Sequence, residues 1–215
     1  MKSPSNTQEV FAVLRRRITS GEYRPSETLT EASLCADLGV SRTTIKKVLL
    51  MLEKEGLVLI EQNKSAKVRA FTLDEILELL DVRIVLEGFV VQNATARISA
   101  EQLEALAGIL RRMEDCVKEK RLLDYSRYNR QFHSVIYDAC SNHSAVELLR
   151  SLKEKISRFD LKTILIPGRD EQSLAEHAAL YDSLRAGDAG RAAQLVEVHV
   201  RNIKEILERY SALLL

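Results

Sequence analysis

Apolar residues recur at three- and four-residue spacings between Ser41 and Gly56, and this period predicts an amphipathic helix. The positions expected to form its buried stripe are Ile45, Val48, Leu49 and Leu52. Ser41 is a suitable N-cap, because its hydroxyl can accept a hydrogen bond from a free amide of the first turn. The helix is expected to end at Gly56.

The segments around this helix extend the pattern. Residues 30–38 predict a short helix, and Gly39 supplies the tight turn that joins two crossed helices. Residues 57–60 predict a strand, residues 61–66 a loop, and residues 67–69 a returning strand. Two helices joined by a turn and followed by a basic hairpin predict a winged helix-turn-helix, which is a DNA-binding architecture.

The helical period continues from residue 72 to the end of the chain, and no strand pattern returns. The six helices expected here cover residues 72–98, 100–119, 123–140, 144–165, 170–185 and 188–213. Residues 71–73 contain no Gly/Ser-rich tract, which indicates a short, stiff joint. The predicted fold is mainly α, with a winged helix-turn-helix domain at residues 1–70 and an all-α helical bundle at residues 74–215.

Length and composition agree with this division. A chain of 215 residues can bury two modest cores, and 46% hydrophobic residues with few Gly and Pro suit a compact helical protein. No apolar run has the length of a membrane span, and the first residues lack the apolar core of a signal peptide. Three well separated cysteines in apolar patterns indicate buried reduced thiols rather than a redox switch. We therefore expect a cytoplasmic protein with no membrane partner.

The near-neutral net charge of +1 conceals an asymmetry between the two parts. Residues 1–70 contain 12 Lys and Arg against 8 Asp and Glu, a net charge of +4. Residues 71–215 contain 20 against 23, a net charge of −3. A basic front domain suits a polyanion such as double-stranded DNA.

Short polar and cationic side chains cover the exposed start of the helix that follows Ser41, and carboxylates return only near its end. This is the layout of a recognition helix, whose first turns enter the major groove. A cationic helix start can also be an ordinary solvated face, but the neighbouring turn and hairpin favour DNA binding. The candidate DNA contacts are Ser41, Arg42, Thr43, Thr44 and Lys46 on the helix, with Lys64 and Lys67 on the wing.

Three of the four histidines can converge within the second domain. Asn129 and His133 are four residues apart, so they share one helix face. His177 lies 10 residues before Gly187 and His199 lies 12 residues after it, which brings both to similar heights in an antiparallel helical hairpin. Two level imidazoles with a third from a facing helix predict an open metal site of the zinc, nickel or manganese type. Alternatively, each histidine is a hydrogen-bonded core residue.

Three stretches of the first domain carry a longer sequence pattern. They read Ile18-x-x-Gly21-x-Tyr23-x-Pro25, Leu34-x-x-x-Leu38-Gly39-Val40-Ser41-Arg42-Thr43 and Leu49-x-x-Leu52-x-x-Glu55-Gly56-Leu57-Val58. With this pattern residues 10–70 resemble the DNA-binding domain of the GntR superfamily of bacterial transcription factors. The resemblance implies that Arg42 and its polar neighbours contact operator bases and phosphates. Lys46 stands where the family has a second arginine, and lysine lacks the two-pronged donor set of that residue.

A second set of motifs marks the all-α domain. They are Arg83-x-x-Leu86-Glu87, Phe132-His133, Asn142, Glu176-His177, Ala186-Gly187-Asp188 and His199. With them, residues 74–205 resemble the FCD domain of the FadR-like branch of that superfamily, in the VanR-like form with six C-terminal helices. The resemblance implies that a divalent metal, with zinc favoured over nickel and manganese, is bound by Asn129, His133, His177 and His199. Asn129 replaces the stronger Asp ligand of the family and donates less charge.

The resemblance also implies a function. A small carboxylate effector is expected near the metal, paired with Arg83 and, as a further candidate, Arg158. We therefore expect a homodimeric transcriptional repressor that reads an inverted repeat in operator DNA, and not an enzyme. Two alternatives stay open, a metal-sensing regulator and a metalloenzyme with a DNA-binding appendage. Glu176 is expected to point away from the face of His177, which leaves the metalloenzyme without an obvious general base.

Overall fold

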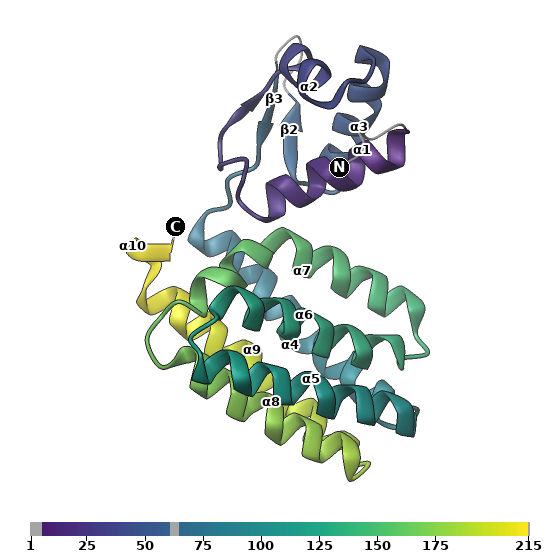
Figure 1. Ribbon diagram of the computed structural model, residues 1–215, viewed down its shortest axis with the longest axis vertical. Helices are drawn as coiled ribbons and strands as arrows, with labels where there is room; N and C mark the ends of the chain where they lie inside the picture. The colour runs from purple at the N-terminus through teal and green to yellow at the C-terminus, as the bar shows by residue number, and fades with distance from the viewer. Residues whose placement is uncertain (1–5, 61–64, 215) are drawn as a thin grey trace. The chain divides into compact units, whose positions relative to one another are not determined.

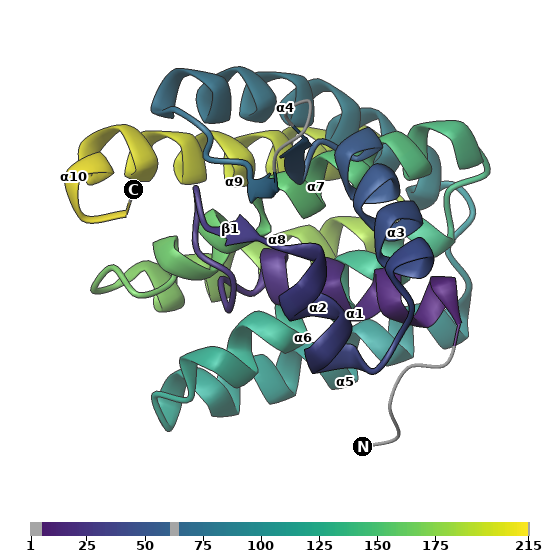
Figure 2. The ribbon, with the colours of Figure 1, turned by 90° about the horizontal axis from the view of Figure 1, so that it is seen from above.

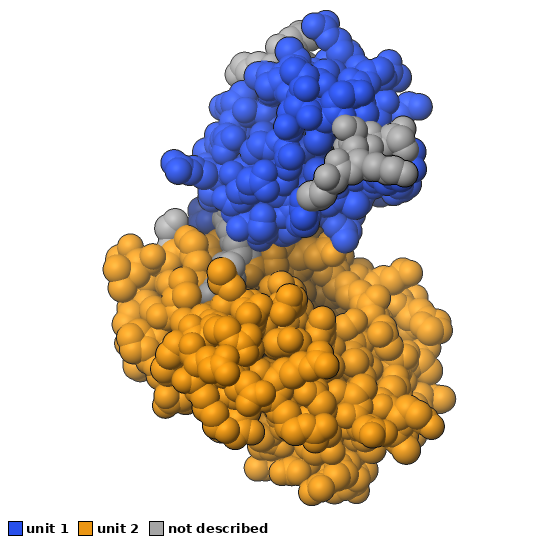
Figure 3. All heavy atoms as spheres, viewed as in Figure 1, with its two compact units in different colours: residues 1–72 blue, residues 73–215 orange. Residues whose placement is uncertain are grey.

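The computed structural model describes residues 6–60 and 65–214, apart from the side chains of Arg158 and Leu161. The chain divides into two compact units, residues 1–72 and residues 73–215 (Figure 3). Each unit has its own cluster of buried apolar side chains. The elements of both units are labelled in Figure 1. The mainly α fold predicted from the sequence is confirmed.

The described part of the first unit contains three helices and a small sheet. Its helices are α1 (Thr7–Thr19), α2 (Glu31–Leu38) and α3 (Arg42–Lys54). Its strands are β1 (Thr28–Leu29), β2 (Val58–Ile60) and β3 (Ala66–Val68). The two helices predicted at residues 30–38 and after Ser41, and the two predicted strands, form close to their expected bounds.

The period of apolar residues accounts for α3. The stripe that is buried against α1 and α2 consists of Ile45, Val48, Leu49 and Leu52. Ser41 caps the helix, since its hydroxyl accepts a hydrogen bond from the backbone amide of Thr44 at 3.2 Å. Gly39 ends α2 with a φ of 68°, a left-handed conformation that glycine adopts without strain. The resulting turn leaves the start of α3 exposed to solvent.

The sheet of the first unit has the order β1-β3-β2, and both pairings are antiparallel. Lys67 of β3 pairs with Thr28 on one side and with Leu59 on the other. The sequence did not predict β1, because a strand of two residues is too short to show an alternating pattern. The base of the wing is therefore a three-stranded sheet rather than a simple hairpin.

The described part of the second unit is entirely helical. Its helices are α4 (Leu73–Thr95), α5 (Ala100–Lys118), α6 (Leu122–Asp138), α7 (His143–Thr163), α8 (Arg169–Arg185), α9 (Ala189–Arg209) and α10 (Ser211–Leu214). The prediction of one helix over residues 188–213 is wrong at its end. The backbone of Tyr210 leaves the helical conformation (φ −114°, ψ 23°), and α10 begins after it.

The helices of the second unit pack as antiparallel neighbours around one core. The most extensive pair is α4 with α9, and these two helices run side by side in Figures 1 and 2. Next come α5 with α6, and α8 with both α5 and α9. In this arrangement α6, α8 and α9, which carry the predicted metal ligands, all contribute to the bundle interior. No helix in the described ranges is long and apolar enough to cross a membrane.

Candidate metal centre and DNA-binding face

The structure brings together the three histidines expected to share a site. His133 on α6, His177 on α8 and His199 on α9 are buried, and one ring nitrogen of each lies within 4.8 Å of the others. Nε2 of His133 is 3.1 Å from Nε2 of His177. The amide oxygen of Asn129, also on α6, lies 2.8 Å from the same His177 nitrogen. Four potential ligand groups therefore converge inside the bundle.

The outward-facing nitrogens of two of these rings have acceptor partners. Nδ1 of His177 lies 2.6 Å from the backbone oxygen of Ser173, one helical turn earlier. Nδ1 of His199 lies 2.5 Å from Oε2 of Glu176. A carbonyl or carboxylate oxygen can only accept, so each Nδ1 is assigned the proton. The Nε2 lone pair of each ring is then directed at the centre.

The third ring is arranged in a similar way by a different helix. Nδ1 of His133 lies 3.2 Å from Oε1 of Glu87 on α4, at an angle outside normal hydrogen-bond geometry. A carboxylate at this distance still favours the proton on Nδ1. The Nε2 atoms of His133 and His177 then face each other as lone pairs with no proton between them. Such an arrangement is unfavourable unless a cation lies among the donors, so these residues fit a metal ion.

Burial keeps the three imidazoles neutral, which is the ligating form. It lowers the pKa of His133 to about 3, with a further contribution from Lys153. Burial also lowers the pKa of His177, reinforced by the other two histidines. The pKa of His199 is lowered by burial, although Glu176 opposes this shift.

Glu87 belongs to a buried network of charged groups. It accepts hydrogen bonds from Arg83 Nε at 2.7 Å, from Lys153 Nζ at 3.2 Å and from the hydroxyl of Tyr137. Burial alone raises the pKa of this carboxyl, but Arg83 and Lys153 more than offset it, and the pKa lies well below its usual value. Arg83 also donates to Asp160 at 3.0 Å. Arg83, expected to pair with an effector, is thus already held by two carboxylates of the chain.

A second network surrounds Glu176. As expected from the sequence, Glu176 points away from the face of His177, and its carboxylate contacts His199 on α9. Arg169 holds its carboxylate with two hydrogen bonds of 2.9 Å, and Asn202 donates a third at 2.7 Å. Burial opposes ionisation of Glu176, yet His199 and Arg169 lower its pKa to about 2. Glu176 therefore orients the ring of His199.

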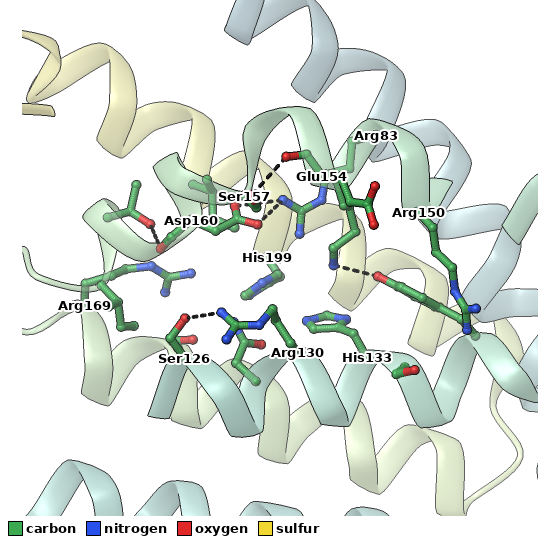
Figure 4. A pocket seen from close by; sticks show the side chains of 18 residues that line it. Arg83, Ser126, Arg130, His133, Arg150, Glu154, Ser157, Asp160, Arg169 and His199 are labelled. Atoms are coloured by element: carbon green, nitrogen blue, oxygen red, sulfur yellow. Dashed lines mark hydrogen bonds and ion pairs between the residues drawn. The ribbon is translucent and has the colours of Figure 1, made fainter. Parts of the chain in front are cut away.

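A cavity of about 310 Å³ opens beside the cluster (Figure 4). His133, His199 and Asn129 contribute to its wall. The cationic residues that line it are Arg83, Arg130, Arg150, Lys153 and Arg169. In Figure 4, Arg83, Arg130 and Arg169 approach this space from different helices. Several of these cations are paired with carboxylates of the chain. The side chain of Arg158, the further effector candidate, lies outside the described residues.

The predicted DNA contacts lie on the surface of the first unit. Arg42, Thr43 and Lys46 are exposed on the first turns of α3, and Lys67 is exposed on β3. Ser41 is also exposed, but its hydroxyl is shared between the amide and the hydroxyl of Thr44. Ser41 therefore has a capping role. Lys64 lies outside the described residues.

The sequence did not predict most of the charged side chains that surround the three histidines. Glu87, Lys153 and Arg169 reach the site from α4, α7 and the start of α8, and no local spacing relates them to the histidines. One signal was available. Arg83 and Glu87 are four residues apart on one helix, which is the spacing of an ion pair.

Comparisons with protein families identify both units. A model of the FCD domain matches residues 78–202, more than half of the chain, and a model of the gntR family of bacterial regulatory proteins matches residues 6–68. This chain belongs to the GntR family and carries an FCD domain. The curated relatives of this GntR-family protein are transcriptional regulators, and it is likewise a DNA-binding regulator and not an enzyme. The metalloenzyme alternative is therefore excluded.

Individual relatives extend over nearly the whole regulator. The HTH-type transcriptional repressor GlaR of Escherichia coli (strain K12) is 25% identical over 207 residues, which cover 93% of this chain and 94% of GlaR. The structure of E. coli McbR/YncC matches with a TM-score of 0.82 at 20% identity, over 96% of this chain and 99% of that one. A structure described as the metal-free FCD domain of TM0439 matches with a TM-score of 0.51 at 26% identity, over 66% of this chain and 99% of that one.

Proposed function

We propose that this regulator is a homodimeric repressor whose affinity for operator DNA is controlled by a small organic acid bound beside a divalent metal. The single observation that carries the proposal is the convergence of four neutral donors beside a cavity that arginine and lysine side chains line. The similarity to GlaR, which is a repressor, favours repression over activation. Because the proposed target is operator DNA, we expect this regulator to act in the cytoplasm.

The metal part of the proposal rests on the donor set. Asn129, His133, His177 and His199 offer three nitrogens and one oxygen, which suits zinc, and also nickel or manganese. If the histidines were ordinary core residues, each Nε2 would have a hydrogen-bond donor opposite it. The protons assigned to Nδ1 of all three rings leave no donor between His133 and His177. The metal would supply a positive charge with open coordination positions. The chain itself orients the rings through Glu87, Ser173 and Glu176.

The DNA part of the proposal rests on the exposed start of α3. Arg42 and Lys46 have no carboxylate partner in the part of the chain that the structure describes. Both are therefore free to contact bases or phosphates, with Ser41 and Thr44 shaping the helix start and Thr43 beside them. Lys67, and by sequence Lys64, would hold the wing against the DNA backbone.

An apolar stripe on the second unit supports the homodimer. Val82, Val85 and Phe89 of α4 are 55%, 73% and 45% exposed, and their spacing puts them on one helix face. Val198 of α9, the helix packed most closely against α4, is 46% exposed. A two-helix apolar face of this kind suits self-association through a symmetric interface. The two DNA-binding units of such a dimer would match the two halves of an inverted repeat.

The control step requires the effector to favour one arrangement of the dimer over the other. We expect an effector to change operator affinity by about 5- to 150-fold, the typical range of such coupling. The short joint at residues 71–73 would transmit the change between the units. For this protein, the metal anchors the effector and is not itself the signal.

Fluorescence anisotropy with the DNA upstream of the gene tests the proposal. Affinity is measured for the metal-loaded protein with and without a panel of small organic acids, and again for His177→Ala. We expect at least one acid to shift affinity, and the shift to disappear in the variant. Operator affinity that is unchanged by every acid, but altered by chelation alone, would instead identify a metal sensor.

A further inference from the structure

The charges around the cavity balance before any metal or effector is considered. The cationic side chains that line it are Arg83, Arg130, Arg150, Lys153 and Arg169. The carboxylates that line it or form ion pairs with these cations are Glu87, Asp138, Glu154, Asp160 and Glu176. Five positive and five negative groups give no net charge among the described side chains. A ligand of the bare cavity therefore needs no particular charge.

A bound divalent metal changes this balance, and Asn129 determines by how much. All four proposed ligands are neutral when they bind a metal, because histidine coordinates through a lone pair of its uncharged ring and an amide carries no charge. The metal would keep its full charge of +2. An aspartate at position 129 would reduce that charge to +1. Uncompensated charge in a partly enclosed site is unfavourable, so the open positions favour an occupant that supplies two negative charges.

Arg130 is a suitable partner for the second negative charge of such an occupant. Arg130 lies four residues after Ser126 and three before His133 on α6, so these three side chains share one helix face, and Asn129 lines the same cavity. The guanidinium of Arg130 donates one hydrogen bond, to Ser126 Oγ at 3.0 Å, and pairs with no carboxylate of the described chain. By contrast, Arg83 and Arg169 are each held by carboxylates. Figure 4 shows Arg130 directed into the same space as His133 and His199.

We infer that the effector is an organic dianion with two separated carboxylates, one directed at the metal centre and the other bound by Arg130. This inference rests on the proposed function and narrows its ligand class. A dicarboxylate neutralises the charge that the neutral donor set leaves on the metal. It also supplies the two-pronged acceptor that an unpaired guanidinium recognises best. A cavity of about 310 Å³ accommodates a small acid of this kind.

Calorimetric titration of the zinc-loaded, full-length protein tests the inference with acids matched in length. Succinate is compared with butyrate, and glutarate with pentanoate. We expect each dicarboxylate to bind at least about tenfold more tightly than its partner. In Arg130→Gln this ratio is expected to fall to about one, with monocarboxylate affinity and zinc content unchanged. The matched control is Arg127→Gln, an exposed residue of the same helix that pairs with Asp124 and does not line the cavity.

Asn129→Asp provides a second, independent variant. The added negative charge is expected to retain zinc at least as well, measured by elemental analysis, and to reduce the preference for dicarboxylates several-fold. Equal binding of both acid series by the unaltered protein would overturn the inference while leaving control by an organic acid intact. Equal loss of both series in Arg130→Gln would overturn it too, because Arg130 would then be structural. No binding of any acid would overturn the inference and the proposed function together.

Discussion

The exposed face of α3 and the cavity of the helical bundle both contain arginine and lysine side chains, but these differ in burial and in pairing. Arg42 and Lys46 are exposed and have no carboxylate partner among the described residues. Arg83 and Arg169 are buried, and each is fixed by carboxylates of the chain. An unpaired surface cation is free to meet a polyanion, whereas a buried, paired cation holds other groups in position. The surroundings of a charged residue, more than its type, therefore indicate its role.

The largest effect is expected from breaking a buried pair. Arg83→Ala leaves Glu87 and Asp160 without their main partner, so the free energy of unfolding of the second unit should fall by about 3–5 kcal/mol. Urea denaturation at fixed metal content measures this. Arg121→Ala, which removes an exposed arginine paired with Glu119 and Asp124, is the control and should change stability far less. Equal losses in the two variants would contradict the distinction between buried and exposed cations.

Removing an exposed cation should affect DNA binding and leave stability intact. Arg42→Ala is expected to weaken operator binding by about 1–3 kcal/mol, because a base or phosphate contact is lost. Lys54→Ala removes a positive charge from the opposite end of the same helix and should have little effect. Fluorescence anisotropy and thermal melting of both variants separate binding from folding. Unchanged operator affinity in Arg42→Ala would argue against α3 as the recognition helix.

The buried histidines predict a pH dependence for the metal-free protein. His133 has a pKa of about 3 in the folded protein and about 6.5 when exposed, so the unfolded chain binds more protons between these values. The free energy of unfolding should therefore fall as the pH drops below 6.5, by about 1.4 kcal/mol per pH unit for this residue. Urea denaturation at pH 7 and pH 5 tests this. The dependence of the free energy of unfolding on pH should become weaker in His133→Gln. It should not change in His143→Gln, which alters an exposed histidine.

The smallest effect is expected at the wing. Lys67 is exposed on β3 and would contact phosphate, which carries no sequence information. Lys67→Ala should weaken binding to specific and unrelated DNA alike, and should reduce the slope of log affinity against log salt by about one. A loss confined to the operator sequence would show that Lys67 reads bases.

Local patterns in the sequence predicted the features that depend on one helix. The stripe from Ile45 to Leu52 and the spacing of Asn129 and His133 follow from helical geometry alone. The pair His177 and His199 also needed only a tight turn between two helices. Each of these inferences uses residues that are close in sequence or symmetric about a turn, where spacing determines position.

Groups that meet across the bundle could not be predicted in this way. Glu176 illustrates the reason. Adjacent residues of a helix point about 100° apart, so Glu176 was correctly expected to avoid the face of His177. No pattern in the neighbouring sequence indicated that α9 would bring His199 to the face of α8 that carries Glu176. The break at Tyr210 and the strand β1 were missed for a different reason, since both features span too few residues to produce a period.

The order of the ligands along the chain has a consequence for synthesis. His133, His177 and His199 come from three helices of the second unit, and the last of them is near the end of the sequence. Domains generally fold as they leave the ribosome, beginning at the N-terminus. The unit that contains α3 is therefore complete while the second unit still lacks one of the proposed metal ligands. If the proposed function holds, a newly made chain can bind DNA before it can bind the effector that would release it.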